Sequence, residues 1–205
     1  MSLLNEVSVP GSVPRYEIPG WRERFGVVAG ITGRGGGSKP YDLGLWTGQP
    51  VGEVMGRWRE LRAAEPGFTA HVLGNQVHGR EIRRQEGGEG WIQIEGVDGH
   101  VTVSRGVMLY VTVADCIPVY LVAPQHRAIA LLHAGWRGTA AGILERGVEA
   151  IYQQSKATPT KIVMHCGVGV CGKCYEVASE VNNALGAVGI LSSPGHFHVD
   201  IRSVL

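Results

Sequence analysis

The sequence has no apolar run that could cross a membrane and no recognisable export signal. Its longest hydrophobic stretch, residues 107–123, is interrupted by Thr112, Asp115 and Pro118, whereas a membrane helix needs about 20 predominantly apolar residues. The N-terminus lacks the basic segment followed by an apolar segment that defines a secretory signal. These absences predict a cytoplasmic protein with no membrane partner.

The net charge of the chain is only +1 at pH 7, because 19 Lys and Arg nearly balance 18 Asp and Glu. A basic surface for nucleic acid or for anionic lipid is therefore not indicated. Cysteine is limited to four residues, and a chain of 205 residues does not need disulfides to fold. We therefore predict free thiols.

Glycine is the abundant residue, with 31 copies, about twice its usual share of roughly 7%. The glycines form short clusters rather than a low-complexity tail, which indicates many tight turns between strands. With 44% hydrophobic residues and this length, residues 1–205 are predicted to form a single domain.

The hydrophobic patterning predicts strands in runs, with a few flanking helices. Apolar residues at spacings of three and four predict helices over residues 51–64, 139–153 (with Thr139 as N-cap) and 175–185. β-branched and aromatic runs predict strands over residues 26–32, 71–78, 81–84, 107–113, 117–122, 127–132 and 161–164. This order is typical of an α+β fold rather than of strict βαβ alternation.

Three side chains that could bind a metal lie at predicted strand ends. His133 follows an apolar strand and opens the segment HAGWRGT, Cys116 lies in a break between two strands, and His78 ends another strand just before a glycine. If the three converge, two imidazoles and one thiolate suit zinc, with a fourth position left for water. Such a site could generate a hydroxide nucleophile near neutral pH.

The same residues allow a second interpretation without a metal. Cys116 and His133 could form a nucleophilic pair in which the imidazole activates the thiolate, with His78 or Asp115 orienting the imidazole. The only CxxC motif, Cys171 to Cys174, has no second CxxC with which to bind zinc. We interpret it as incidental packing. We interpret Asp98 as a turn residue.

Several segments taken together resemble the multicopper polyphenol oxidase (laccase) family, also called the YfiH family. They are the segments TGRGGGS at 32–38, NQVH at 75–78, VDG at 97–99, ADCIP at 114–118, HAGWRGT at 133–139 and CYEV at 174–177. The likeness runs from about residue 25 to the end. It implies that the family's C-terminal stretch, with its Ser-Tyr-Arg-Arg motif, is not contained in these residues.

The resemblance implies a layered α/β/β/α sandwich with mixed sheets and a zinc ion bound by His78, Cys116 and His133, which would also be the catalytic residues. It implies phosphorolysis of adenosine, inosine and methylthioadenosine, and adenosine deamination. Copper-dependent phenol oxidation is the older assignment, but eight scattered histidines do not form multicopper clusters, so copper is the less favoured metal. Some bacterial members are linked instead to editing of peptidoglycan precursors, for which the Cys–His pair would serve.

Substrate roles can be assigned to four further residues. Arg34 and Arg137 are candidates for binding phosphate or charge that develops on the ribose. Gln76 and Asp115 would orient the metal ligands or a water molecule. The expected partners are a nucleoside and phosphate.

Overall fold

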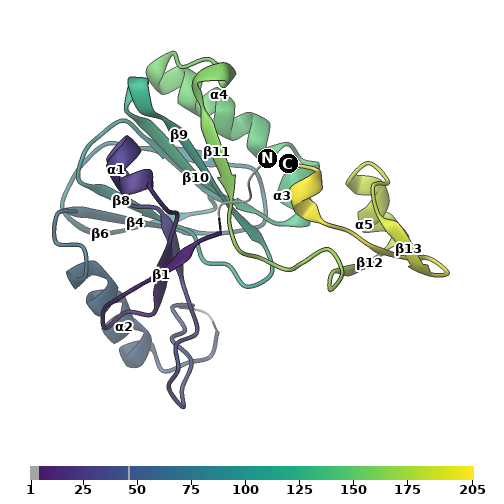
Figure 1. Cartoon of the computed structure of the whole chain (residues 1–205), viewed down its shortest axis with the longest axis horizontal. Helices are drawn as coiled ribbons and strands as arrows, with labels where there is room; N and C mark the ends of the chain where they lie inside the picture. The colour runs from purple at the N-terminus through teal and green to yellow at the C-terminus, as the bar shows by residue number, and fades with distance from the viewer. Residues whose placement is uncertain (1–4, 46) are drawn as a thin grey trace. The chain divides into compact units, whose positions relative to one another are not determined.

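Two groups of elements make up the chain in the computed structural model, which describes residues 5–45 and 47–205. The contacts separate a first unit, Met1–Thr69, from a second unit, Ala70–Leu205. The described residues contain five α-helices and four sheets, one of which is mixed (Figure 1). The α+β prediction is confirmed.

The first unit combines a small antiparallel sheet with two helices. Its elements are β1 (Val7–Val9), β2 (Arg15–Glu17), α1 (Trp21–Phe25), β3 (Gly30–Thr32) and α2 (Val51–Ala63). The predicted helix over residues 51–64 is confirmed to within one residue, and Val54 and Trp58 are its buried positions. The predicted strand over residues 26–32 is shorter, because Gly26 adopts a left-handed conformation that ends α1.

The second unit contains the remaining regular elements. They are β4 (Ala70–Asn75), β5 (Ile82–Gln85), β6 (Gly90–Glu95), β7 (Gly99–Thr102), β8 (Val107–Tyr110), β9 (Ile117–Ala123), β10 (Ala128–Ala134), α3 (Trp136–Ala140), α4 (Ile143–Ser155), β11 (Val163–Cys166), β12 (Glu176–Ala178), α5 (Ser179–Ala184), β13 (Ile190–Ser193) and β14 (His196–His198). Single 3-10 turns occur at Pro124–His126, Pro159–Lys161 and Ile201–Ser203.

A five-stranded sheet with the order β11-β9-β10-β7-β5 forms the centre of this unit. Its first four strands are antiparallel and β5 pairs with β7 in parallel, so the sheet is mixed. All seven residues of β9 are buried, which explains why this strand is continuously apolar instead of alternating.

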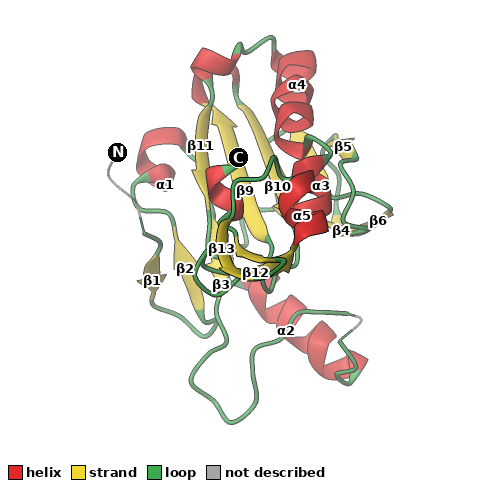
Figure 2. Cartoon of the chain, turned by 90° about the vertical axis from the view of Figure 1, so that its right-hand side faces the viewer, coloured by secondary structure: helices red, strands yellow, loops and turns green. Residues whose placement is uncertain are grey.

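Strand β10 packs against α4 on one face of its sheet and against a second sheet on the other face. Ala128, Ala130 and Leu132 face one core that also contains residues of α4, and Figure 2 shows α4 running alongside β10. Ile129 and Leu131 face the opposite core, which they share with the parallel sheet β6-β4-β8. Because successive side chains of a strand point to opposite faces, this one strand contributes to both cores.

Two of the helix predictions are wrong at their N-terminal ends. Residues 176–178 form β12, in which only Val177 is buried, and pair with β14; the helix α5 begins at Ser179. Thr139 lies inside the short helix α3 rather than capping a long helix. Gly142, with φ of 82°, separates α3 from α4 and is the N-cap of α4, because glycine adopts this conformation without strain.

Within the part of the chain that the structure describes, no helix combines the length and the apolar character needed to cross a membrane.

The packing of α4 on the sheet depends on Gly147, which gives a testable prediction. A Cβ atom at this position would lie 2.6 Å from Leu132 Cδ1 and 3.1 Å from Leu121 Cδ1. We expect Gly147→Ala to lower the free energy of unfolding by about 1–3 kcal/mol, because overpacking outweighs the gain in helix propensity. Urea denaturation measures the change.

Gly56→Ala in α2 is the matched control, since no atom other than those of its chain neighbours and of the helix's own backbone lies within 4 Å of its added Cβ. It should leave stability unchanged or raise it by up to about 1 kcal/mol. Equal stabilisation by both substitutions would show that Gly147 is not a packing requirement.

Candidate metal centre

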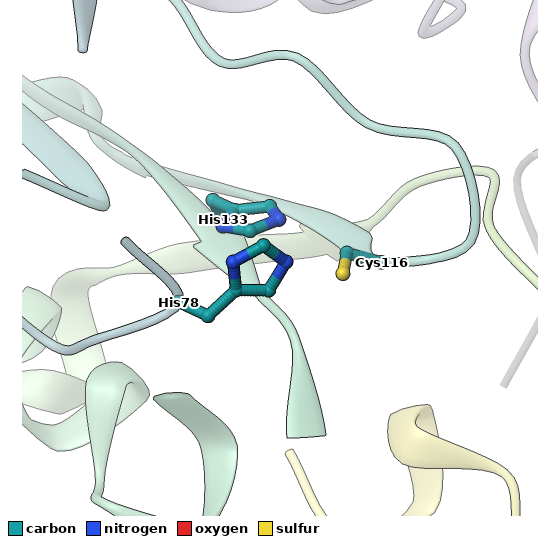
Figure 3. Close-up of side chains that lie close together, drawn as sticks. All are labelled: His78, Cys116 and His133. Carbon is teal, nitrogen blue, oxygen red and sulfur yellow. The ribbon is translucent and has the colours of Figure 1, made fainter. Parts of the chain in front are cut away.

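The structure brings His78, Cys116 and His133 together. One nitrogen of each histidine and the Cys116 sulfur all lie within 4.8 Å of one another, and the three side chains point toward one another (Figure 3). The two imidazole rings are 4.9 Å apart between centroids and meet edge to face at 76°. His133 is buried, Cys116 is half-buried and His78 is exposed, so the group opens to solvent on the His78 side.

Strand pairing explains how two of these residues meet. The antiparallel register of β9 and β10 pairs Ile117 with Ala134 and Pro118 with His133. Cys116 therefore stands at the end of β9, next to the end of the strand that carries His133. Cys116 and His133 are 17 positions apart in the sequence, and the β9–β10 hairpin brings them together.

A buried carboxylate, Asp98, fixes the third residue relative to the other two. Its two oxygens accept hydrogen bonds from the backbone N–H groups of Val77 at 3.2 Å, His78 at 2.9 Å and Gly79 at 2.8 Å. The same carboxylate lies 2.8 Å from Nδ1 of His133, and Asp98 has no exposed surface. One side chain thus anchors both the turn that carries His78 and the ring of His133.

The turn at His78 is conformationally strained. His78 has φ of 58°, which is uncommon for a residue other than glycine. Such conformations persist where the surroundings hold them, and they concentrate at functional sites. Here the three hydrogen bonds from consecutive backbone amides to Asp98 provide that support.

The Asp98–His133 pair shifts the pKa of both groups. Burial opposes ionisation of Asp98, but hydrogen bonds from His133 and from the backbone N–H groups of Gly79 and Val77 outweigh it and lower the pKa of Asp98. Burial likewise disfavours a charged His133, but the hydrogen bonds with Asp98 and Cys116 raise the pKa of His133 to about 9. Nδ1 of His133 is held by Asp98, so Nε2 remains for the metal, and a metal ion must compete there with a proton.

Glycines keep the space between these side chains clear. A Cβ atom at Gly135 would lie 3.0 Å from the sulfur of Cys116 and 3.2 Å from Cδ2 of His78. A Cβ atom at Gly138 would lie 2.6 Å from the carbonyl oxygen of Gly79, so α3 packs closely on the turn that carries His78. The glycines of the HAGWRGT segment are therefore needed for close approach.

The four residues predicted to contact substrate occupy different settings. The Gln76 side chain bonds to Thr112, donating to its carbonyl oxygen at 2.8 Å and accepting from its backbone N–H at 2.7 Å. Asp115 is exposed beside Cys116. Arg137 is exposed, and its guanidinium lies 4.3 Å from the ring centroid of Trp136.

Arg34 belongs to the first unit, where it lines an open cavity of about 370 Å³ together with the basic residues Lys39 and Arg57. Lys39 and Arg57 both form ion pairs with Glu53.

Two residues near the centre were not identified as functional from the sequence. Asp98 was predicted to be a turn residue, although it lies in one of the segments on which the family resemblance rests. Tyr175 has a raised pKa, because burial and the nearby Cys116 and Asp115 disfavour its phenolate more than Arg137 stabilises it. Its place in the CYEV segment was the signal that could have identified it.

The donor set fits a metal ion. Two imidazoles and a thiolate, with a carboxylate behind one imidazole, are typical of a metal site in which the outer hydrogen bond sets the ring orientation. The described residues contain no other group of three or more His, Cys, Asp or Glu side chains with this convergence.

Removal of the anchoring carboxylate should weaken metal binding. We expect Asp98→Asn to reduce the affinity for a divalent ion by about 10–100-fold, since the outer-shell partner of His133 and the acceptor for the His78 turn are weakened together. Competition with a chromophoric chelator measures the affinity. Glu145→Gln, which changes an exposed carboxylate on α4, is the control. Equal affinity in the wild type and Asp98→Asn would contradict this role.

Gly135→Ala tests the clearance between the ligands. The φ of −81° at this position suits alanine, so the fold should be retained while the added methyl group displaces Cys116 or His78. We expect weaker metal binding with a melting temperature close to that of the wild type. A loss of stability without a loss of affinity would show that the glycine serves packing alone.

Comparison with known proteins identifies the family of the chain. A family model described as multi-copper polyphenol oxidoreductase laccase matches residues 28–205. The chain is 41% identical over 168 residues to purine nucleoside phosphorylase ORF3 of Streptomyces griseus, which covers 77% of this chain and 67% of that protein. It is 34% identical over 140 residues to adenosine deaminase RL5 of an unknown prokaryotic organism, which covers 64% of this chain and 51% of that protein.

The fold is similar to that of a solved structure. The crystal structure of YlmD from Geobacillus stearothermophilus superposes with a TM-score of 0.85 at 26% sequence identity, covering 97% of this chain and 81% of that chain. The family model, the relatives and the fold all agree, and the chain belongs to the multi-copper polyphenol oxidoreductase laccase (YfiH) family, an enzyme family whose members include proteins named purine nucleoside phosphorylase and adenosine deaminase.

Proposed function

We propose that this protein is a zinc-dependent purine nucleoside phosphorylase acting on adenosine, inosine and methylthioadenosine, with adenosine deamination as a second reaction. The observation that carries the proposal is the convergence of His78, Cys116 and His133 around one point, within a chain 41% identical to a purine nucleoside phosphorylase. The relative named adenosine deaminase supports the second reaction.

Zinc is favoured over copper by the donor set. Zinc sites that act in catalysis take three protein ligands, often including imidazole and thiolate, and leave the fourth position to water or substrate. When bound at these three residues, zinc would supply a Lewis acid for an oxygen of the substrate or of water. A multicopper oxidase needs several clusters of metal ligands, whereas the described residues contain a single such cluster.

Phosphorolysis places a positional demand on the protein residues. An oxygen of phosphate attacks C1′ of the ribose while the bond from C1′ to the base nitrogen breaks, so phosphate must be held beside the sugar. Arg137 is exposed next to the centre and has a rigid, planar guanidinium, which matches the oxygens of phosphate. Its stacking on Trp136 limits the orientations of the guanidinium.

Other residues would orient the substrate rather than neutralise charge. Tyr175 keeps its phenolic proton because its pKa is raised, so it can donate a hydrogen bond to a ribose hydroxyl. Asp115 is exposed beside Cys116 and can accept one. Gln76 holds Thr112 in the segment that leads to Cys116, and would act by positioning that segment. Arg34 is a second candidate for phosphate, on the basis of the family's glycine-rich turn.

The reaction itself tests the proposal. Purified protein loaded with zinc should convert inosine and phosphate into hypoxanthine and ribose 1-phosphate, which chromatography separates. Removal of the metal by a chelator should stop turnover, and zinc should restore it. The absence of turnover with inosine, adenosine and methylthioadenosine would rule out the assignment.

The role of Arg137 predicts a specific kinetic change. Arg137→Ala should raise the KM for phosphate by about 10–100-fold, because one charge-assisted contact is lost. Arg137→Lys should restore only part of the affinity, since lysine lacks the planar fork. Arg146→Ala, which removes an exposed arginine on α4, should have no effect. An unchanged KM in Arg137→Ala would assign phosphate binding elsewhere.

A second candidate function follows from the closeness of His133 and Cys116, whose ligand atoms lie within 4.8 Å of each other. A thiolate beside an imidazolium is the arrangement of cysteine hydrolases, and a peptidoglycan precursor would be the substrate in that case. Alkylation of Cys116 in metal-free protein distinguishes the two. It would abolish hydrolysis by a Cys–His pair, whereas the zinc enzyme has no activity to lose in that state.

A further inference from the structure

The CxxC motif, which the metal centre does not use, forms a close pair of thiols. The sulfurs of Cys171 and Cys174 lie 2.9 Å apart. The N–H groups of Cys174 and Tyr175 both donate to the carbonyl oxygen of Cys171, at 2.9 Å and 3.1 Å, and this turn holds the pair together. Both side chains are exposed, so the two thiols are accessible from solvent.

We propose that Cys171 and Cys174 form a reversible dithiol–disulfide site that reacts with low-molecular-weight disulfides. A disulfide bond measures about 2.05 Å, so the two sulfurs need to approach by less than about 1 Å. Their exposure gives a small disulfide access from solvent. The site lies outside the metal ligands, and the proposal does not depend on the reaction catalysed there.

The surroundings of the pair favour Cys171 as the attacking thiol. Its pKa is lowered by the hydrogen bond with Cys174, against a smaller opposing effect of desolvation, and further by the backbone N–H groups of Cys174 and Lys173 and the positive charge of Arg202. The pKa of Cys174 is raised by the same hydrogen bond. Since the thiolate is the nucleophile, the two cysteines would take different parts in the exchange.

The exchange balances with a small disulfide such as oxidised glutathione. The Cys171 thiolate attacks one sulfur of oxidised glutathione, the bond between its sulfurs breaks, and one glutathione thiolate leaves. Cys174 then loses its proton and attacks the Cys171 sulfur of the mixed disulfide, which releases the second glutathione thiolate. The two protons of the cysteines end on the two glutathione thiols, so the protein is oxidised by two electrons and one glutathione disulfide is reduced.

The turn is connected to the loop that carries a metal ligand. The N–H group of Val170, next to Cys171, donates to the carbonyl oxygen of Asp115 at 2.9 Å. A Cβ atom at Gly169 would lie 2.9 Å from the carbonyl oxygens of both Asp115 and Cys116, which shows how closely the two segments pack. A disulfide would restrict the turn next to this contact and so slow the opening of the Val170 hydrogen bond.

Redox titration of the full chain tests the proposal. The protein is equilibrated in mixtures of reduced and oxidised glutathione, alkylated, digested and analysed by mass spectrometry. In oxidising mixtures we expect the peptide containing both cysteines to lose two hydrogens and to escape alkylation, and dithiothreitol should reverse both changes. Hydrogen exchange at Val170 should slow in the oxidised form.

Variants separate this result from general thiol oxidation. Cys174→Ser should accumulate a single glutathione adduct on Cys171, because the resolving thiol is absent. Cys166→Ser, which changes a half-buried cysteine in β11, should form the disulfide as the wild type does. The proposal would be overturned if Cys171 and Cys174 could still be alkylated in oxidising mixtures. It would also be overturned if each of them retained a separate glutathione.

Discussion

The buried carboxylate of Asp98 is the interaction on which the candidate centre depends. It accepts hydrogen bonds from three consecutive backbone amides and from one imidazole, so each oxygen has two partners. A carboxylate without exposed surface is tolerated in a protein interior only when it is satisfied in this way. The cost of burying the charge is therefore offset by the same bonds that set the positions of His78 and His133.

The sheet supplies the rest of the geometry. β9 and β10 pair over seven residues, and both strands are packed against α4 on one side. A closely packed interior has low compressibility, so the core holds His133 firmly and fixes the start of β9, directly after Cys116. His133 is part of β10 and Cys116 directly precedes β9, whereas His78 lies in a turn, whose position Asp98 fixes through its hydrogen bonds.

Much of this arrangement could be predicted from the sequence. The apolar runs identified the central strands, because burial leaves a direct pattern in β9 and β10. The residue types and the strand ends suggested that His78, Cys116 and His133 converge, and the structure brings them within range of one ion. The helix expected over residues 175–185 began too early, because Val177 and Val181 fit a helical spacing as well as they fit a strand followed by a helix.

Contacts between residues that are distant in the sequence could not be predicted. Nothing local distinguishes a carboxylate that ends a turn from one that anchors two segments, so Asp98 could not be placed without the fold. The proximity of the sulfurs of Cys171 and Cys174 likewise depends on the turn conformation, which spacing alone leaves open. The division of residues 136–155 into two helices results from the left-handed Gly142, which a helical periodicity does not reveal.

The convergence of His78, Cys116 and His133 has a thermodynamic consequence. Because the three donors meet only when the chain is folded, a metal ion would bind the native state more tightly than the unfolded ensemble. Any such ligand stabilises the fold by mass action, by about 2.7 kcal/mol when its free concentration is about 100 times its dissociation constant. The metal supply of the cell would then set the protein's resistance to unfolding and proteolysis, as well as its activity.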